Sequence, residues 1–214
     1  MDRWATFDCY GTLIDWNGGI GRELERLFGP DRAGSMLHRY HEIEPQVQRE
    51  DPKRSYREVM AISLARLGPV AAGEEDALGR SLPSWQPFGE THASLEDARK
   101  RGWKLAILSN TDRDFIDASM ERIGVPFELA IVASEIGSYK PAHRHWEEFF
   151  SRTGADRNGH VHVGASLFHD VAPARELGLR TIWVNRLGEE PNPRPDVELR
   201  TLTGLGGALD ELAP

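Results

Sequence analysis

The sequence predicts an α/β fold, in which helices cover both faces of a parallel β-sheet and a helical segment is inserted after the first strand. From residue 92 onward, short apolar runs alternate with stretches of helical periodicity. Between residues 15 and 91, apolar positions recur at helical spacing and no strand-like run occurs. We therefore expect a core formed by residues 1–14 and 92–214, and a helical unit formed by residues 15–91.

The strands of the predicted core are short apolar runs that are closed by turn residues. The first begins near Trp4 and ends at the carboxylate of Asp8, just before the pair Gly11-Thr12. Further strands are expected at residues 103–108, 129–132, 160–163 and 181–184. The helices between and after them are expected at residues 94–101, 112–123, 142–152, 165–177 and 205–212.

The inserted unit reads as four helices followed by a linker. These helices are expected at residues 19–28, 31–50, 55–67 and 74–82. Gly29-Pro30 and Gly68-Pro69 end two of them, because glycine favours a helix C-terminus and proline cannot continue the helix. Residues 81–88 contain two prolines and are expected to lead the chain back to the sheet.

The composition limits the partners of the chain. Of its 214 residues, 39% are hydrophobic and 28% are charged, and the formal net charge is −8. An acidic balance argues against a nucleic-acid-binding surface. No apolar run approaches membrane-spanning length, and the N-terminus has no signal-peptide pattern. These features favour a small-molecule substrate over nucleic acid or membrane.

The one cysteine, Cys9, bears on both compartment and mechanism. A single cysteine excludes an internal disulfide and favours a cytoplasmic location. Cys9 neighbours Asp8, but strand periodicity directs the two side chains to opposite faces. We therefore expect a buried small apolar side chain rather than a catalytic thiol.

Polar residues follow the ends of consecutive predicted strands. Asp8 ends the first strand, Ser109 and Asn110 end the second, Lys140 follows the third, and Ser166 and Asp170 follow the fourth. In open α/β sheets, ligands bind beyond the carboxyl ends of the strands. These side chains are therefore expected to meet in one site, although Asp8 could also cap a turn and Lys140 could be a surface lysine.

The stretch Asp8-Cys-Tyr-Gly-Thr-Leu-Ile14 resembles the first motif of the haloacid dehalogenase superfamily, Asp-x-x-Gly-Thr. The polar residues at the later strand ends match the remaining three motifs in order. The resemblance implies a Rossmann-like core with an inserted helical cap. It also implies that Asp8 is a nucleophile that forms a covalent intermediate.

The chemistry of such a nucleophile gives the other polar residues their expected roles. Lys140 supplies a cation that orients the carboxylate, and Ser109 and Asn110 can donate hydrogen bonds to substrate oxygens. Asp170 can accept hydrogen bonds, position Lys140, or take a proton from the attacking water. The alternative for Asp170 is an N-cap of the following helix.

Two departures from the phosphatases of the superfamily favour another reaction. Those enzymes usually carry a second Asp two residues after the nucleophile, where this chain has Tyr10, and a phenol is a poor proton shuttle. They also usually carry an acidic Mg²⁺ ligand where this chain has Ala165. Displacing halide from carbon needs neither group, because halide is a weak base. We therefore expect no metal or other cofactor, with Mg²⁺ required only by the phosphatase alternative.

Tyr10 is also similar to the first motif of L-2-haloacid dehalogenases, Asp-x-Tyr-Gly-Thr. That branch uses a cap arginine for the substrate carboxylate or the halide, and Arg39 is the best candidate. The cap contains other arginines that remain alternatives, namely Arg22, Arg26, Arg49, Arg54 and Arg57.

Other positions differ from the branch or have no counterpart in it. Ser166 stands where the branch has Asn, and Trp146 stands where it has Tyr. These two residues and Tyr10 are expected to contact the substrate. His169 has no counterpart, and it is either a local base or a helix-start residue.

The predicted function is hydrolytic dehalogenation of a small 2-haloacid through an aspartyl ester at Asp8. A Mg²⁺-dependent phosphatase is the alternative enzyme, and an inactive superfamily member that acts as a binding protein is the alternative class. A homodimer is left open. The halogen and the chain length of the acid do not follow from the sequence.

Overall fold

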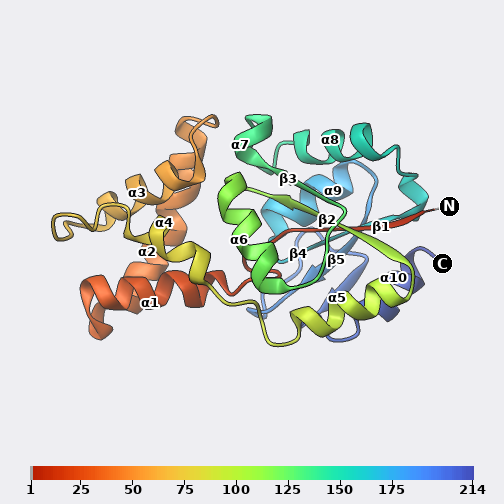
Figure 1. Cartoon of the computed structure of the whole chain (residues 1–214), viewed down its shortest axis with the longest axis horizontal. Helices are drawn as coiled ribbons and strands as arrows, with labels where there is room; N and C mark the ends of the chain where they lie inside the picture. The colour runs from red at the N-terminus through yellow and green to blue at the C-terminus, as the bar shows by residue number, and fades with distance from the viewer. Residues whose placement is uncertain (1) are drawn as a thin grey trace.

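The computed structural model describes residues 2–214, and its centre is a six-stranded parallel sheet with strand order β3-β2-β1-β4-β5-β6 (Figure 1). The strands are β1 (Arg3–Phe7), β2 (Trp103–Ser109), β3 (Leu129–Val132), β4 (His160–Gly164), β5 (Arg180–Val184) and β6 (Val197–Leu199). The predicted α/β class is confirmed. Its short buried strands follow the apolar runs of the sequence.

Strand β1 is the middle of the sheet and determines where the site forms. Ala5 is in register with Leu105 of β2 on one side and with Val161 of β4 on the other. Because all three strands are parallel, their carboxyl ends share one edge. Asp8, which comes directly after β1, therefore lies between the ends of β2 and β4.

Helices cover both faces of the sheet, and alternate residues of each strand pack against them. On one face, Phe7 and Leu105 join a core with residues of α5 (Thr91–Lys100), α6 (Arg113–Ile123) and α10 (Leu205–Leu212). On the other face, strand residues pack on α8 (Arg144–Thr153) and α9 (Ala172–Glu176). Figure 1 shows α5 and α10 on one side of the sheet and α8 and α9 on the other.

A group of helices stands at one end of the core (Figure 1). It contains α1 (Trp16–Phe28), α2 (Pro30–Glu50), α3 (Tyr56–Leu67), α4 (Ala77–Ser81) and the short 3₁₀-helix η1 (Leu82–Ser84). We call these elements the cap. The predicted helices are present, with the fourth shorter than expected. The boundaries of the unit at residues 15–91 stay a prediction.

The cap is tied to the core through the start of α3. The Asp112 carboxylate accepts hydrogen bonds from the backbone N–H groups of Tyr56 at 2.8 Å and Arg57 at 2.9 Å. A carboxylate at this position satisfies unpaired N–H groups and complements the helix dipole. Tyr139 also donates its hydroxyl to the Arg54 carbonyl at 3.0 Å. These contacts hold one wall of the cap against the end of the sheet.

Several elements differ from the expectation. The strand β6 and the short helix α7 (Ala133–Ile136) were not predicted, because three or four residues give too little periodicity to detect. The helix expected at residues 165–177 begins instead with a π-type turn, η3 (Leu167–Val171). Residues 2–214 contain no helix that is both long and apolar enough to cross a membrane.

Candidate active site

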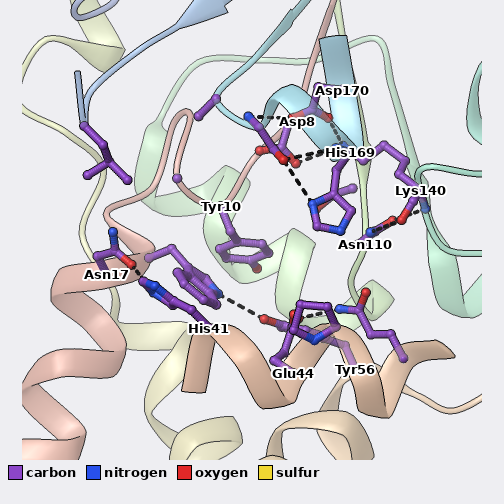
Figure 2. A pocket seen from close by; sticks show the side chains of 18 residues that line it. Asp8, Tyr10, Asn17, His41, Glu44, Tyr56, Asn110, Lys140, His169 and Asp170 are labelled. Atoms are coloured by element: carbon purple, nitrogen blue, oxygen red, sulfur yellow. Dashed lines mark hydrogen bonds and ion pairs between the residues drawn. The ribbon is translucent and has the colours of Figure 1, made fainter. Parts of the chain in front are cut away.

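Asp8 lies in a pocket of about 270 Å³ between the carboxyl edge of the sheet and the cap (Figure 2). Its backbone N–H continues the pairing of β1 with β4 by donating to the Val163 carbonyl at 2.9 Å. The chain then turns sharply, and Leu13 donates its N–H to the Cys9 carbonyl at 2.7 Å. This turn frees the Asp8 side chain to face the pocket. Cys9 is fully buried, as predicted.

Two side chains hold the carboxylate of Asp8. Lys140 donates from Nζ to Oδ1 at 3.0 Å, and Thr12 donates from Oγ1 to Oδ2 at 2.8 Å. Thr12 Oγ1 in turn accepts the N–H of Ala165 at 2.9 Å, which links this turn to the end of β4. Burial raises the pKa of Asp8 to about 6, although Lys140 acts in the opposite direction.

Lys140 is the cation of the site. Its side chain is 1% exposed, and Nζ lies 3.0 Å from Asp8 and 2.6 Å from Oδ1 of Asp170. Burial by itself lowers the pKa of Lys140, but the two carboxylates outweigh burial and raise it. A permanently charged ammonium group therefore lies between the two acids.

Asn110 holds the backbone of Lys140. Its Oδ1 accepts the Lys140 N–H at 2.6 Å, and its Nδ2 donates to the Lys140 carbonyl at 3.0 Å. Asn110 also lines the pocket, as does Ser109, whose buried Oγ has no hydrogen-bond partner among residues 2–214. An unpaired hydroxyl at this point can donate to a substrate oxygen.

Asp170 is buried beneath Lys140 and is held on several sides. In addition to Lys140, it accepts the N–H of Ser166 at 3.2 Å, and His162 Nε2 lies 3.5 Å from Oδ1. Burial alone raises the pKa of Asp170, but Lys140 and His162 hold it well below its usual range. Gly164 makes room for this arrangement, because a Cβ there would lie 2.5 Å from the Cβ of Asp170.

A buried polar chain beneath Asp170 was missed by sequence reasoning. Thr6 Oγ1 lies 2.8 Å from Nδ1 of His162 and 2.9 Å from Nε2 of His160. Thr6, His160 and His162 occupy one face of neighbouring strands at a separation of two residues. The sequence His-Val-His-Val at residues 160–163 could have indicated that both histidines lie on the same face of a strand.

The cap side of the pocket is aromatic and polar. Trp16 donates its indole N–H to the Tyr56 hydroxyl at 3.0 Å. Glu44 of α2 accepts a hydrogen bond from Gln48, one turn further along the helix. Burial raises the pKa of Glu44 to about 7, although Tyr56 and Gln48 oppose the rise. His41 lines the same wall, as Figure 2 shows.

Tyr10 connects this wall to the core. Its hydroxyl pairs with Ser119 Oγ of α6 at 2.9 Å, and its ring is stacked on Tyr56 with a centroid separation of 6.5 Å. Burial raises the pKa of Tyr10, so that the phenol stays protonated. Tyr10 and Ser166 both line the pocket, and their contact with the substrate stays a prediction.

Two predicted substrate contacts are corrected by the structure. Arg39 is exposed on α2, with Nη1 3.4 Å from the carbonyl of Leu67, and it does not line the pocket. Trp146 is fully buried on the sheet face that α8 and α9 cover, where the centre of its ring lies 5.0 Å from that of His162. Arg39 misses the pocket because its side of α2 faces away from the side that carries Glu44.

Another cap arginine lies near the site. Arg49 of α2 lines a second cavity of about 180 Å³, which shares Lys140 and His169 with the main pocket. None of the other cap arginines lines either cavity in the described part of the chain.

The donor set does not suit Mg²⁺. Ala165 has no side-chain oxygen, and the ammonium group of Lys140 already lies between the Asp8 and Asp170 carboxylates. No cluster of three His, Cys, Asp or Glu residues that could hold a metal ion occurs within residues 2–214.

The fold and the site define an α/β protein whose pocket is built around a carboxylate–lysine pair beneath a helical cap. A family model described as haloacid dehalogenase-like hydrolase matches residues 70–184. The chain is 31% identical over 211 residues to (S)-2-haloacid dehalogenase of Pseudomonas sp. (strain YL), with 93% of this chain and 90% of that protein covered. The chain therefore belongs to the haloacid dehalogenase-like hydrolases.

Two further comparisons describe its place in the family. The chain is 30% identical over 155 residues to phosphoserine phosphatase of Thermus thermophilus, with 70% of this chain and 61% of that protein covered. Its fold matches the solved structure of L-2-haloacid dehalogenase from Xanthobacter autotrophicus with a TM-score of 0.84 at 18% identity. That match covers 98% of this chain and 99% of the other.

Proposed function

We propose that this protein hydrolyses the carbon–halogen bond of small 2-haloacids through an ester at Asp8. In the first step, an oxygen of Asp8 attacks the halogen-bearing carbon, a C–O bond forms, and halide leaves with the bonding electron pair. In the second step, water attacks Cγ of Asp8. The products are a 2-hydroxy acid, the regenerated carboxylate and one proton, which is released to solvent.

The observation that carries this proposal is the set of groups around Asp8. Lys140 and Thr12 orient the carboxylate, while a protonated phenol and a methyl group stand at positions 10 and 165. A halide needs no proton from position 10, and its displacement needs no oxygen ligand for a metal at position 165. The (S)-2-haloacid dehalogenase relative supports the same substrate class.

The cap offers a different arginine for the substrate carboxylate from the one expected. Because Arg39 is outside the pocket, we propose that Arg49, in the adjoining cavity, attracts the substrate carboxylate. The unpaired hydroxyl of Ser109 and the amide of Asn110 then provide donors within the pocket itself.

A direct test is halide release from bromoacetate and 2-chloropropionate by the purified protein, with and without EDTA. We expect release that survives chelation, because the donor set does not suit Mg²⁺. If EDTA abolishes halide release and Mg²⁺ restores it, the metal-free mechanism is contradicted.

A Mg²⁺-dependent phosphatase is the second candidate. The phosphatase relative and the retained Asp8, Lys140 and Asp170 favour it. Hydrolysis of p-nitrophenyl phosphate measured with added Mg²⁺ separates the two. Phosphatase turnover without halide release would replace the dehalogenase proposal, and failure of both would favour the inactive binding protein.

The ligand we propose is a small molecule, in keeping with the size of the pocket. A cytoplasmic location and a homodimer stay predictions from the sequence.

A further inference from the structure

The second step of the proposed reaction needs a base for the attacking water, and Asp170 is poorly placed for that task. Its side chain is 1% exposed, and both of its oxygens already accept hydrogen bonds, from Lys140 and from the Ser166 N–H. Because Lys140 and the Ser166 N–H occupy these oxygens, the carboxylate has little capacity left to accept a proton from water.

His169 is the neighbouring group that faces the pocket. It lines the main pocket together with Asp8, and Figure 2 shows its ring directed from the core side into this space. Its backbone N–H donates to Ser166 Oγ at 3.0 Å, and its Nδ1 lies 3.1 Å from the same oxygen. Within residues 2–214, Nε2 makes no hydrogen bond.

The contact with Ser166 fixes the imidazole for proton uptake. A serine oxygen has two lone pairs, so it can accept both the His169 backbone N–H and a proton carried on Nδ1. We assign that tautomer, because the Nδ1–H donation is equally possible for the neutral and the protonated ring. Nε2 then presents a lone pair to the pocket, and the ring need not turn when it takes up a proton.

The surroundings keep the imidazole neutral and give it access to water. Lys140 and Arg49 face the ring as cations and Asp170 as an anion, and burial is the main cause that lowers the pKa of His169 to about 4. His169 also lines the second cavity of about 180 Å³, so the ring lies at the boundary between the two spaces. Water in the second cavity can therefore approach the ring of His169.

We propose that His169 is the general base that hydrolyses the ester at Asp8, and that Ser166 is its positioning residue. The inference rests on the proposed function. Nε2 removes a proton from water as the water oxygen bonds to Cγ of Asp8. When the tetrahedral intermediate collapses, the bond from Cγ to the substrate oxygen breaks, and this oxygen takes the proton from Nε2. Asp8 is released as the carboxylic acid, which carries the second proton of the water, and it regains its carboxylate by losing this proton to solvent. No other reactant is consumed.

The test compares the wild type with His169→Gln, using bromoacetate. In the variant, steady-state halide release is expected to fall by about 10²–10⁴-fold, which is typical for loss of a general base. The first turnover should still release one halide per protein molecule. Intact-mass and peptide mass spectrometry should then find the accumulated ester on Asp8. His143→Gln, at a partly exposed histidine outside the pocket, is the matched control and should turn over like the wild type.

Each outcome decides one claim. Absence of halide release by the wild type overturns the proposed function and this inference with it. Wild-type turnover in His169→Gln, or loss of its first turnover in a folded variant, overturns the inference and leaves the proposed function in place. If His169→Gln does not fold, Ser166→Ala replaces it. This variant should slow ester hydrolysis more than ester formation, and equal slowing of both steps overturns the assignment.

Discussion

At the scale of single residues, the position of Arg39 changes the expected result of its mutation. The guanidinium is exposed and contacts the Leu67 carbonyl, so Arg39→Lys should change kcat/KM by no more than about twofold, as is usual for a surface substitution. Arg49→Gln, which removes the charge, should raise KM by about fivefold, in line with about 1 kcal/mol for an exposed charge contact. Steady-state kinetics with 2-chloropropionate measures both. A larger effect at Arg39 than at Arg49 would contradict this assignment.

The pKa of Asp8 predicts the pH dependence of ester formation. Only the ionised carboxylate attacks carbon, and burial raises its pKa to about 6. The ionised fraction, and with it the rate of the first halide release, should therefore increase as the pH rises through 6 and level off above 7. Rapid-mixing measurements of this first release provide the profile. A rate that is constant from pH 5 to pH 8 would show that Asp8 is already ionised throughout this range.

Single residues show how far the sequence could predict the site. Asp8, Lys140 and Asp170 follow β1, β3 and β4, whose carboxyl ends share one edge of the sheet, so their meeting could be inferred from the order of the motifs. Arg39 and Trp146 could not be placed, because a helix face is decided by packing between segments that are distant in the sequence.

At the scale of elements, the buried acid of α2 makes the stability of the cap depend on pH. The pKa of Glu44 rises from 4.5 to about 7 on folding, so its protonated form is favoured in the folded state. The wild type should therefore lose stability as the pH rises from 4.5 through 7. By linkage, this loss is on the order of 3 kcal/mol above pH 7.

Glu44→Gln tests this prediction because glutamine keeps the shape and cannot ionise. The variant should have a higher Tm than the wild type at pH 8, and the difference should disappear near pH 5. Glu42→Gln is the control, since Glu42 lies on the same helix with a side chain that is 64% exposed. Identical pH profiles for Glu44→Gln and the wild type would contradict a buried, protonated Glu44.

The elements were predicted well where they are long and periodic. The helices of the cap and the strands β1 to β5 follow apolar patterns that depend on local sequence. The turn η3, which brings the adjacent residues His169 and Asp170 to the site, could not be predicted. Its geometry depends on the Ser166 contacts and on the space above Gly164, which exist only in the folded chain.

At the scale of the whole molecule, the site exists because the cap closes over the carboxyl edge of the sheet. The Asp112 contacts with α3 and the stacking of Tyr10 on Tyr56 join the two parts around the pocket. Burial of Lys140 at the base of this pocket lowers the local dielectric and strengthens its interaction with the nucleophile. The alternation of strands and helices in the sequence was enough to predict the core and the cap. The residues that line the pocket could not be predicted, because they depend on how the cap packs against the core.

The covalent mechanism is tested most directly by a single turnover in ¹⁸O-water with protein in excess over bromoacetate. If water attacks Cγ of Asp8, the label must enter the Asp8 carboxylate, and the glycolate from the first turnover must be unlabelled. Peptide mass spectrometry of residues around Asp8 and mass analysis of the product measure both. Labelled glycolate with an unlabelled Asp8 would mean that water displaces the halide directly, and it would contradict the ester mechanism.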